Sequence, residues 1–175
     1  RDTDRSRGLG DVYKRQGENW LRILNYKIQT EASEGLGYQT YTPGKNDYVY
    51  MKLFPQDDIE PLGISPLGTD TVAVHYRGKL INGTVFDQSF SGNWNAEVSE
   101  PRSFAVSGVI VGWTTALMQM KEGQHVELYI PASLGYGSVA SGEIPAYSAL
   151  VFDVRLEEVI HPKGPDDRSL KLKME

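Results

Sequence analysis

A single stretch of this chain has the apolar spacing of an α-helix, and that scarcity constrains the fold more than any other feature. After Gly112, apolar residues recur at the i, i+3, i+4 and i+7 positions that share one face of a helix. These residues are Trp113, Ala116, Leu117 and Met120. Gly123 follows where a residue in the left-handed conformation would end the helix. One short helix cannot enclose a core by itself, so strands must supply the rest.

Segments on both sides of this helix alternate apolar and polar residues with the period of a strand. The alternation covers residues 49–53, 72–76, 126–130 and 150–156, with shorter strands at 84–86 and around Phe104 and Val106. Before the strand at 84–86 lies Asn82-Gly83, a pair that favours a type I′ hairpin turn because both residues tolerate positive φ. The pattern predicts an α+β fold, with an antiparallel sheet of about five strands wrapped on one short helix.

The two ends of the chain lie outside this pattern. Residues 1–16 lack apolar periodicity, which predicts a solvated tail, and their run GLGDVYKRQ resembles translated adaptor or vector sequence. Residues 17–45 form a segment of uncertain structure, because the apolar residues between Asn19 and Gln29 fit a helix and a strand equally well. We expect the globular domain to span residues 46–161 and a polar tail to occupy residues 162–175.

Composition excludes several classes of function. The formal net charge is −5 and the isoelectric point about 5.3, so no diffuse positive field is present to attract nucleic acid. The absence of cysteine excludes disulfides and thiolate catalysis. His75, His125 and His161 share no ligand-like spacing with carboxylates, so we expect neither a metal site nor a cofactor. No stretch approaches ~18 consecutive apolar residues, which predicts no integral membrane segment.

Three longer segments carry more specific signals. They read VHYRGKLINGTVFDQSF, FAVSGVIVGWTTALMQMKEGQ and IPASLGYGSVASGEIPAYSALVFDVRLEEV. In order and spacing they resemble the FKBP family of peptidyl-prolyl cis/trans isomerases, and the resemblance covers about two thirds of the chain. The preceding run NDYVYMKLF resembles bacterial cell-envelope members of the family, which implies a periplasmic or envelope location, with the cytoplasm as the alternative.

The resemblance implies a pocket that holds the proline of a peptide substrate. It gives catalytic roles to Ile110, whose backbone N–H would donate to the substrate carbonyl, to Tyr136, whose hydroxyl would be a second donor, and to Asp87, which would orient the pocket. The substrate-binding residues that it implies are Tyr76, Phe86, Phe104, Val109, Trp113, Ile144 and Phe152. Trp113 would form the floor. His75 alternates with Tyr76 and should therefore face the other side of the sheet.

Two residues depart from the family pattern. Arg102 stands near the place where the best-known members have a pocket phenylalanine, and Glu143 stands where the flap over the pocket is commonly apolar. The resemblance implies macrolide inhibitors as further ligands, but both departures argue against tight binding of such compounds. With Ala146, they also keep open a second interpretation, in which the domain binds proline peptides or acts as a chaperone with weak catalysis. A third is a scaffold role for the N-terminal segment.

An aromatic pocket suits the chemistry of prolyl isomerisation. Rotation about an X-Pro bond crosses a barrier of ~18–20 kcal/mol because it breaks the C–N resonance, and no covalent bond is made. An apolar pocket disfavours the dipolar planar amide more than the twisted one, and only such differential binding raises the turnover rate. We therefore expect an isomerase that acts on proline-containing peptides or unfolded proteins and assists their folding.

Overall fold

The computed structural model describes residues 2–4, 10–15, 18–28, 44–54 and 62–162. Within them, nine antiparallel strands form one sheet with the order β1-β2-β3-β4-β8-β9-β5-β6, and β7 also pairs with β5. The strands are β1 (Asp2–Asp4), β2 (Gly10–Arg15), β3 (Glu18–Leu24), β4 (Tyr48–Leu53), β5 (Thr71–Leu80), β6 (Val85–Gln88), β7 (Arg102–Ala105), β8 (His125–Ile130) and β9 (Leu150–Ile160). The predicted α+β class is confirmed.

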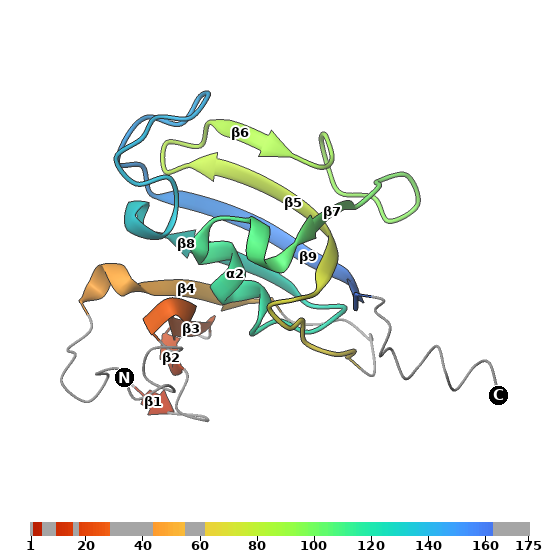
Figure 1. Cartoon of the computed structure of the whole chain (residues 1–175), viewed down its shortest axis with the longest axis horizontal. Helices are drawn as coiled ribbons and strands as arrows, with labels where there is room; N and C mark the ends of the chain where they lie inside the picture. Colours follow the sequence, from red (N-terminus) through yellow and green to blue (C-terminus); the bar gives the residue numbers. More distant parts are fainter. Residues whose placement is uncertain (1, 5–9, 16–17, 29–43, 55–61, 163–175) are drawn as a thin grey trace.

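The helix α2 (Val111–Leu117) lies across one face of the central strands, which we call the helix face (Figure 1). The 3-10 turn η3 (Val106–Gly108) connects β7 to α2, whereas η2 (Lys45–Asp47) precedes β4 and η4 (Ala132–Leu134) follows β8. Six residues of α2, including Trp113 and Leu117, are buried, as are Val74 of β5 and Val154 of β9. Burial of a large apolar side chain such as Trp113 or Leu117 contributes roughly 1.5–3 kcal/mol, so this interface stabilises the fold.

Close approach of α2 to the sheet depends on Gly112. A Cβ atom at this position would lie 2.5 Å from Cγ2 of Ile130 on β8, a distance that real Cβ contacts do not reach. Because Ile130 is β-branched and buried, its side chain has little freedom to move away. The glycine therefore sets how deeply the first turn of α2 sits on the sheet, and with it the position of Trp113.

The sheet is wider than the predicted five or so strands, because strands from the N-terminal segment extend it beyond β4. Residues 18–24, for which helix and strand fitted equally well, form β3, and residues 26–28 are helical. β3 pairs with β4 along its length.

A solvated tail was expected for residues 1–16, whereas in the structure residues 2–4 and 10–15 form β1 and β2. Backbone pairing needs no apolar period, so these strands leave no pattern in the sequence. Residues 163–175 lie outside the described part of the chain.

Two local predictions need correction. Gly123 does have a positive φ of 92°, but α2 ends earlier, with Met118 as its C-cap, and Gly123 lies in the next turn. The hairpin turn is not type I′, because Gly83 has a φ of 91° whereas Asn82 is not among the positive-φ residues. The Gly83 N–H donates to the Leu80 carbonyl at 2.9 Å, so the turn ends with Gly83 in the left-handed region. This arrangement is the three-residue hairpin loop, which needs only one such residue.

Candidate active site

Tyr76 lies at the centre of β5 and directs its side chain to the helix face. Its ring meets the Trp113 ring of α2 edge-on, with centroids 5.3 Å apart and an interplanar angle of 90°. Because strand side chains alternate, the neighbours His75 and Arg77 point to the opposite side, which we call the outer face. The ring of His75 indeed contacts Trp94 there, at 5.9 Å between centroids. The prediction that His75 faces away from the pocket is therefore confirmed.

Trp113 is the hub of an aromatic cluster. Besides Tyr76, its ring meets Phe152 of β9 at 5.2 Å and Phe104 of β7 at 5.7 Å, both near edge-on. Phe86 of β6 meets Phe152 in the same way at 5.5 Å. Edge-to-face pairs at these distances stabilise by roughly 0.5–1.5 kcal/mol each beyond the area they bury. Four separate strands and the helix thus hold one rigid set of rings.

Gly78 on β5 makes room for the rings of Phe86 and Phe152. A Cβ atom there would lie 2.5 Å from Phe152 and 2.7 Å from Phe86. The two phenylalanines therefore meet directly over the backbone of this glycine. Gly78 is the glycine of the HYRG motif, but the motif alone does not indicate that the residue must be small to leave space for two rings.

The rings surround a pocket of about 310 Å³. Its lining residues are Tyr76, Phe86, Asp87, Phe104, Gly108, Val109, Ile110, Trp113, Tyr136 and Phe152. Nine of the ten residues proposed from the sequence are therefore brought together. Ile144 is not among the lining residues: it is 5% exposed and belongs to the hydrophobic core. Gly108 was missed, because a glycine that lines a pocket with its backbone leaves no side-chain pattern.

A polar network occupies one side of this pocket. The Tyr76 hydroxyl donates to Oδ2 of Asp87 at 2.5 Å and accepts from Nη1 of Arg102 at 2.9 Å. The same guanidinium nitrogen lies 3.2 Å from Oδ1 of Asp87. Burial, and then the hydrogen bond to Asp87, raise the pKa of Tyr76 to about 12, although the charge of Arg102 acts in the opposite direction. Tyr76 therefore remains a neutral donor that fixes the Asp87 carboxylate.

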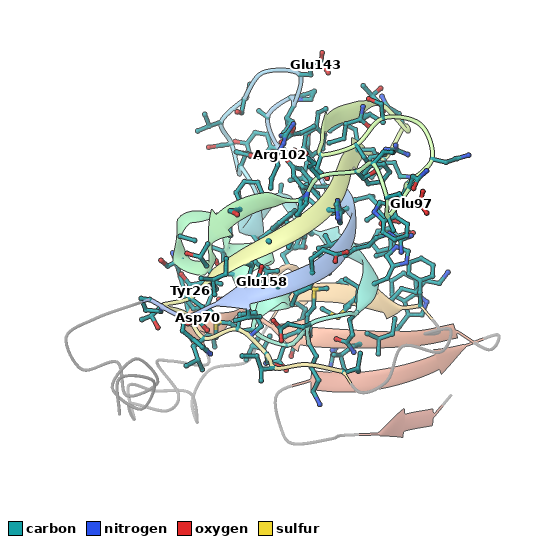
Figure 2. The ribbon with its side chains drawn as sticks, turned by 90° about the vertical axis from the view of Figure 1, so that its right-hand side faces the viewer. Tyr26, Asp70, Glu97, Arg102, Glu143 and Glu158 are labelled. Atoms are coloured by element: carbon teal, nitrogen blue, oxygen red, sulfur yellow. The ribbon has the colours of Figure 1, made fainter. Side chains whose placement is uncertain are left out.

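Arg102 has a different place from the one its sequence position suggested. It is not among the pocket-lining residues, and its side chain is 52% exposed at the rim, where it pairs with Asp87. Glu143 lies at the tip of the loop between β8 and β9 and points away from Arg102, as Figure 2 shows. The Arg102 guanidinium does lie over the outer side of the cluster, 5.7 Å from the centroid of the Tyr76 ring, but its side chain is not among those that line the pocket.

The backbone of Ile110 closes the pocket where α2 begins. Ile110 is the N-cap residue, and its carbonyl accepts from the N–H groups of Trp113 and Thr114 at 2.9 and 3.1 Å. The side chain of Thr114 donates to the Val106 carbonyl at 2.6 Å, which anchors the start of the helix to η3. Among the hydrogen bonds of the described residues, none uses the Ile110 N–H. Ile110 lines the pocket, and its N–H is an available donor.

Tyr136 reaches the pocket from the long loop between β8 and β9. The loop is held by hydrogen bonds from the Gly137 N–H to the Ala132 carbonyl and from the Tyr147 N–H to the Gly137 carbonyl, both 2.8 Å. Tyr136 itself is 40% exposed. Its ring is thus at the pocket mouth, where the hydroxyl can meet either a ligand or water.

Acidic and histidine side chains do not gather into a metal centre in the part of the chain that the structure describes. Each histidine instead lies beside one carboxylate: His125 is 2.8 Å from Asp153, His161 is 2.8 Å from Asp70, and His75 is 3.6 Å from Glu157. Over the described ranges, no helix is long and apolar enough to cross a bilayer.

The comparisons with known proteins agree on one family. The family model described as FKBP-type peptidyl-prolyl cis-trans isomerase matches residues 64–157. The chain is 48% identical over 161 residues to the FKBP-type 22 kDa peptidyl-prolyl cis-trans isomerase of Escherichia coli K12, covering 88% of this chain and 71% of that protein. It is 38% identical over 159 residues to the isomerase FkpA of Aeromonas hydrophila, covering 90% of this chain and 51% of that protein.

The fold agrees with this match. The crystal structure of FkpA from Escherichia coli superposes with a TM-score of 0.56 at 34% identity, over 78% of this chain and 60% of that chain. The matched residues 64–157 contain every residue that lines the pocket. This chain therefore belongs to the FKBP-type peptidyl-prolyl cis-trans isomerases.

Proposed function

We propose that the aromatic pocket binds the proline of a peptide and accelerates rotation about the bond before it by removing that amide from water. The observation that carries this proposal is the ring cluster around Trp113, which is 4% exposed and lies beside an available backbone donor. In water, the planar amide is stabilised by its large dipole. Inside a ring-lined pocket that stabilisation falls, while the twisted amide loses less. A differential of ~5–8 kcal/mol would accelerate rotation roughly 10⁴- to 10⁶-fold.

The polar groups of the pocket have separate roles in this proposal. The Ile110 N–H donates to the substrate carbonyl, and the Tyr136 hydroxyl is a second donor at the pocket mouth. Asp87 faces the carbonyl region with its orientation fixed by Tyr76, at 2.5 Å, and by Arg102. None of these groups gains or loses a proton during rotation. The mechanism is therefore conformational, and positioning supplies its specificity.

The test is a protease-free isomerisation assay on an aliphatic- or aromatic-Pro peptide, followed by NMR exchange between the cis and trans signals. We expect exchange well above the uncatalysed rate at micromolar protein. Absence of acceleration, with binding of the same peptide retained, would favour the alternative of a peptide-binding or chaperone module with weak catalysis. The absence of the Arg102 side chain from the lining supports the catalytic alternative, because most of the lining is then apolar.

The unit that performs this function is proposed to span residues 46–161. The family match at 64–157 lies inside it, and β4 joins it through pairing with β8. We propose that residues 1–16 are dispensable for catalysis, which deletion of that segment tests by turnover and melting temperature. Proline-containing segments of unfolded proteins are the proposed substrates. The bacterial relatives and the run NDYVYMKLF support a location in the cell envelope, which fractionation of cells that produce the full-length protein would test.

A further inference from the structure

The edge strand beside β5 is interrupted, and the interruption separates two residues of the pocket network. β6 pairs with β5 up to Gln88 opposite Arg77, and β7 resumes the pairing with Arg102 opposite Val74. Residues 89–101 leave the sheet between these two halves, as the loop beyond β6 in Figure 1 shows. Asp87 lies near the end of the first half and Arg102 begins the second. Residues 89–101 therefore join the two strands whose side chains meet at Tyr76.

This excursion crosses to the outer face of the sheet and is anchored there by Trp94. The guanidinium of Arg155 lies over the Trp94 ring, 4.2 Å from its centroid, and the His75 ring meets it edge-on. Arg155 of β9 and His75 of β5 are directly opposed in the sheet, so they present one continuous surface to the indole. His75 is 4% exposed, whereas Val98 farther along the excursion is 74% exposed. Trp94 is thus the apolar anchor of a segment that is otherwise largely solvated.

Arg77 holds the first part of the same excursion. Its Nε donates to Oε1 of Gln88 at 2.9 Å, and its Nη2 donates to the carbonyls of Phe90, at 3.4 Å, and Gly92. Ser89 forms paired hydrogen bonds with the backbone of Tyr76, each 2.8 Å. These contacts stop before Trp94. The farther half of the excursion, which leads back to Arg102, has Trp94 as its attachment to the sheet.

We propose that Trp94 is a positioning residue of the active site, although it lies on the opposite face of the sheet from the pocket. By fixing residues 89–101 on Arg155 and His75, it sets the approach of Arg102 to Asp87 and Tyr76. The inference rests on the proposed role of Asp87 in catalysis. It adds that this role depends on a contact made through the sheet, by residues that touch neither the pocket nor a substrate.

The experiment compares Trp94→Ala and Trp94→Phe with the matched control Val98→Ala, which changes an exposed residue of the same excursion. Each protein is measured for kcat and KM with a proline peptide, and for melting temperature. We expect Trp94→Ala to lower kcat/KM about tenfold, since small misplacements of positioned groups cost that much or more. Trp94→Phe should recover most of the loss because a phenyl ring also stacks on a guanidinium. Val98→Ala should match the wild type.

A coupling measurement separates positioning from a general loss of stability. In an Asp87→Ala background, Trp94→Ala should cause almost no further loss, because its effect passes through the carboxylate. An equal loss in both backgrounds would overturn the inference, as would full activity of Trp94→Ala beside an impaired Asp87→Ala. That second result leaves the proposed function intact. Full activity of Asp87→Ala would instead overturn the proposed role of Asp87 and the positioning inference with it. If Trp94→Ala does not fold, Arg155→Met removes the same contact from the sheet side and should lower kcat/KM in the same direction.

Discussion

Replacement of Tyr76 by phenylalanine tests the polar network with the smallest possible change. The variant keeps the ring that packs on Trp113 and removes the hydroxyl, which bonds to Asp87 at 2.5 Å and to Arg102 at 2.9 Å. Hydrogen bonds to charged groups contribute roughly 1.5–3 kcal/mol when buried. Here both charged side chains are about half exposed, at 49% and 52%, so water replaces part of the interaction. We expect a loss of about 1 kcal/mol, or ~2–4 °C in melting temperature for a chain of this size.

The same change should lower kcat/KM about fivefold, since about 1 kcal/mol of lost positioning corresponds to that factor. NMR exchange measures the rate, and a melting curve measures the stability in the same preparation. Tyr136→Phe is the matched control for removal of a hydroxyl. It should leave the melting temperature unchanged because Tyr136 is 40% exposed. Wild-type kcat/KM in Tyr76→Phe would contradict the proposed role of the network.

Alkaline pH provides a second measure of the same hydroxyl. The pKa of Tyr76 is raised to about 12 in the folded protein, whereas an unfolded tyrosine titrates near 10. Between these values the unfolded chain releases a proton that the folded chain retains, so stability must fall as the pH rises through this window. Below the lower value the contribution is fully present. The wild type should therefore lose more stability than Tyr76→Phe above about pH 10, and parallel denaturation curves for the two proteins would refute the raised pKa.

Three further outcomes are expected, two from the packing and one from the absence of a titrating group in the mechanism. Trp113→Ala should lower the free energy of unfolding by about 3–5 kcal/mol, measured by urea denaturation, and weaken peptide binding, measured by titration. An unchanged peptide affinity would show that Trp113 is not the pocket floor. Gly112→Ala should cost about 1–3 kcal/mol, because the added Cβ meets Ile130 at 2.5 Å, whereas Gly68→Ala, with open space around it, should be neutral in the same denaturation. Finally, kcat/KM should be flat between about pH 6 and 8, where histidine normally changes charge. A tenfold change in the wild type that disappears in His75→Asn would bring His75 into the mechanism.

Most of the pocket could be predicted because its residues lie on strands with strong alternation. Tyr76 and Phe152 stand on the apolar face of β5 and β9, and the single helical period located Trp113. Ile144 is the one predicted residue that does not line the pocket, for a physical reason. It lies in an irregular loop, where a bridge between Ser141 and Ile144 turns its side chain into the core, and no periodicity reports such a turn.

The residues that sequence reasoning misjudged act through partners distant in the chain. Arg102 appeared to be a charge in the pocket, yet the structure pairs it with Asp87, from which the excursion over 89–101 separates it. The structure of residues 18–24 was ambiguous because their apolar residues fit both the helical and the strand period. Pairing with the edge of β4 makes this segment a strand, β3. In each case the deciding interaction is a long-range contact, about which a local pattern contains no information.

The two faces of β5 have different roles at the site: one lines the pocket and the other contacts the loop over residues 89–101. On the helix face, Tyr76 meets rings that exclude water, and this is where a dipolar amide would lose its solvation. On the outer face, His75 and Arg77 contact residues 88–94, which follow Asp87 and lead toward Arg102. A pocket that relies on desolvation cannot contain many fixed charges, because each would carry its own water into the site. This chain limits such charges to Asp87, which lines the pocket, and Arg102, which pairs with it at the rim, and it places the contacts of His75 and Arg77 on the opposite side of the sheet.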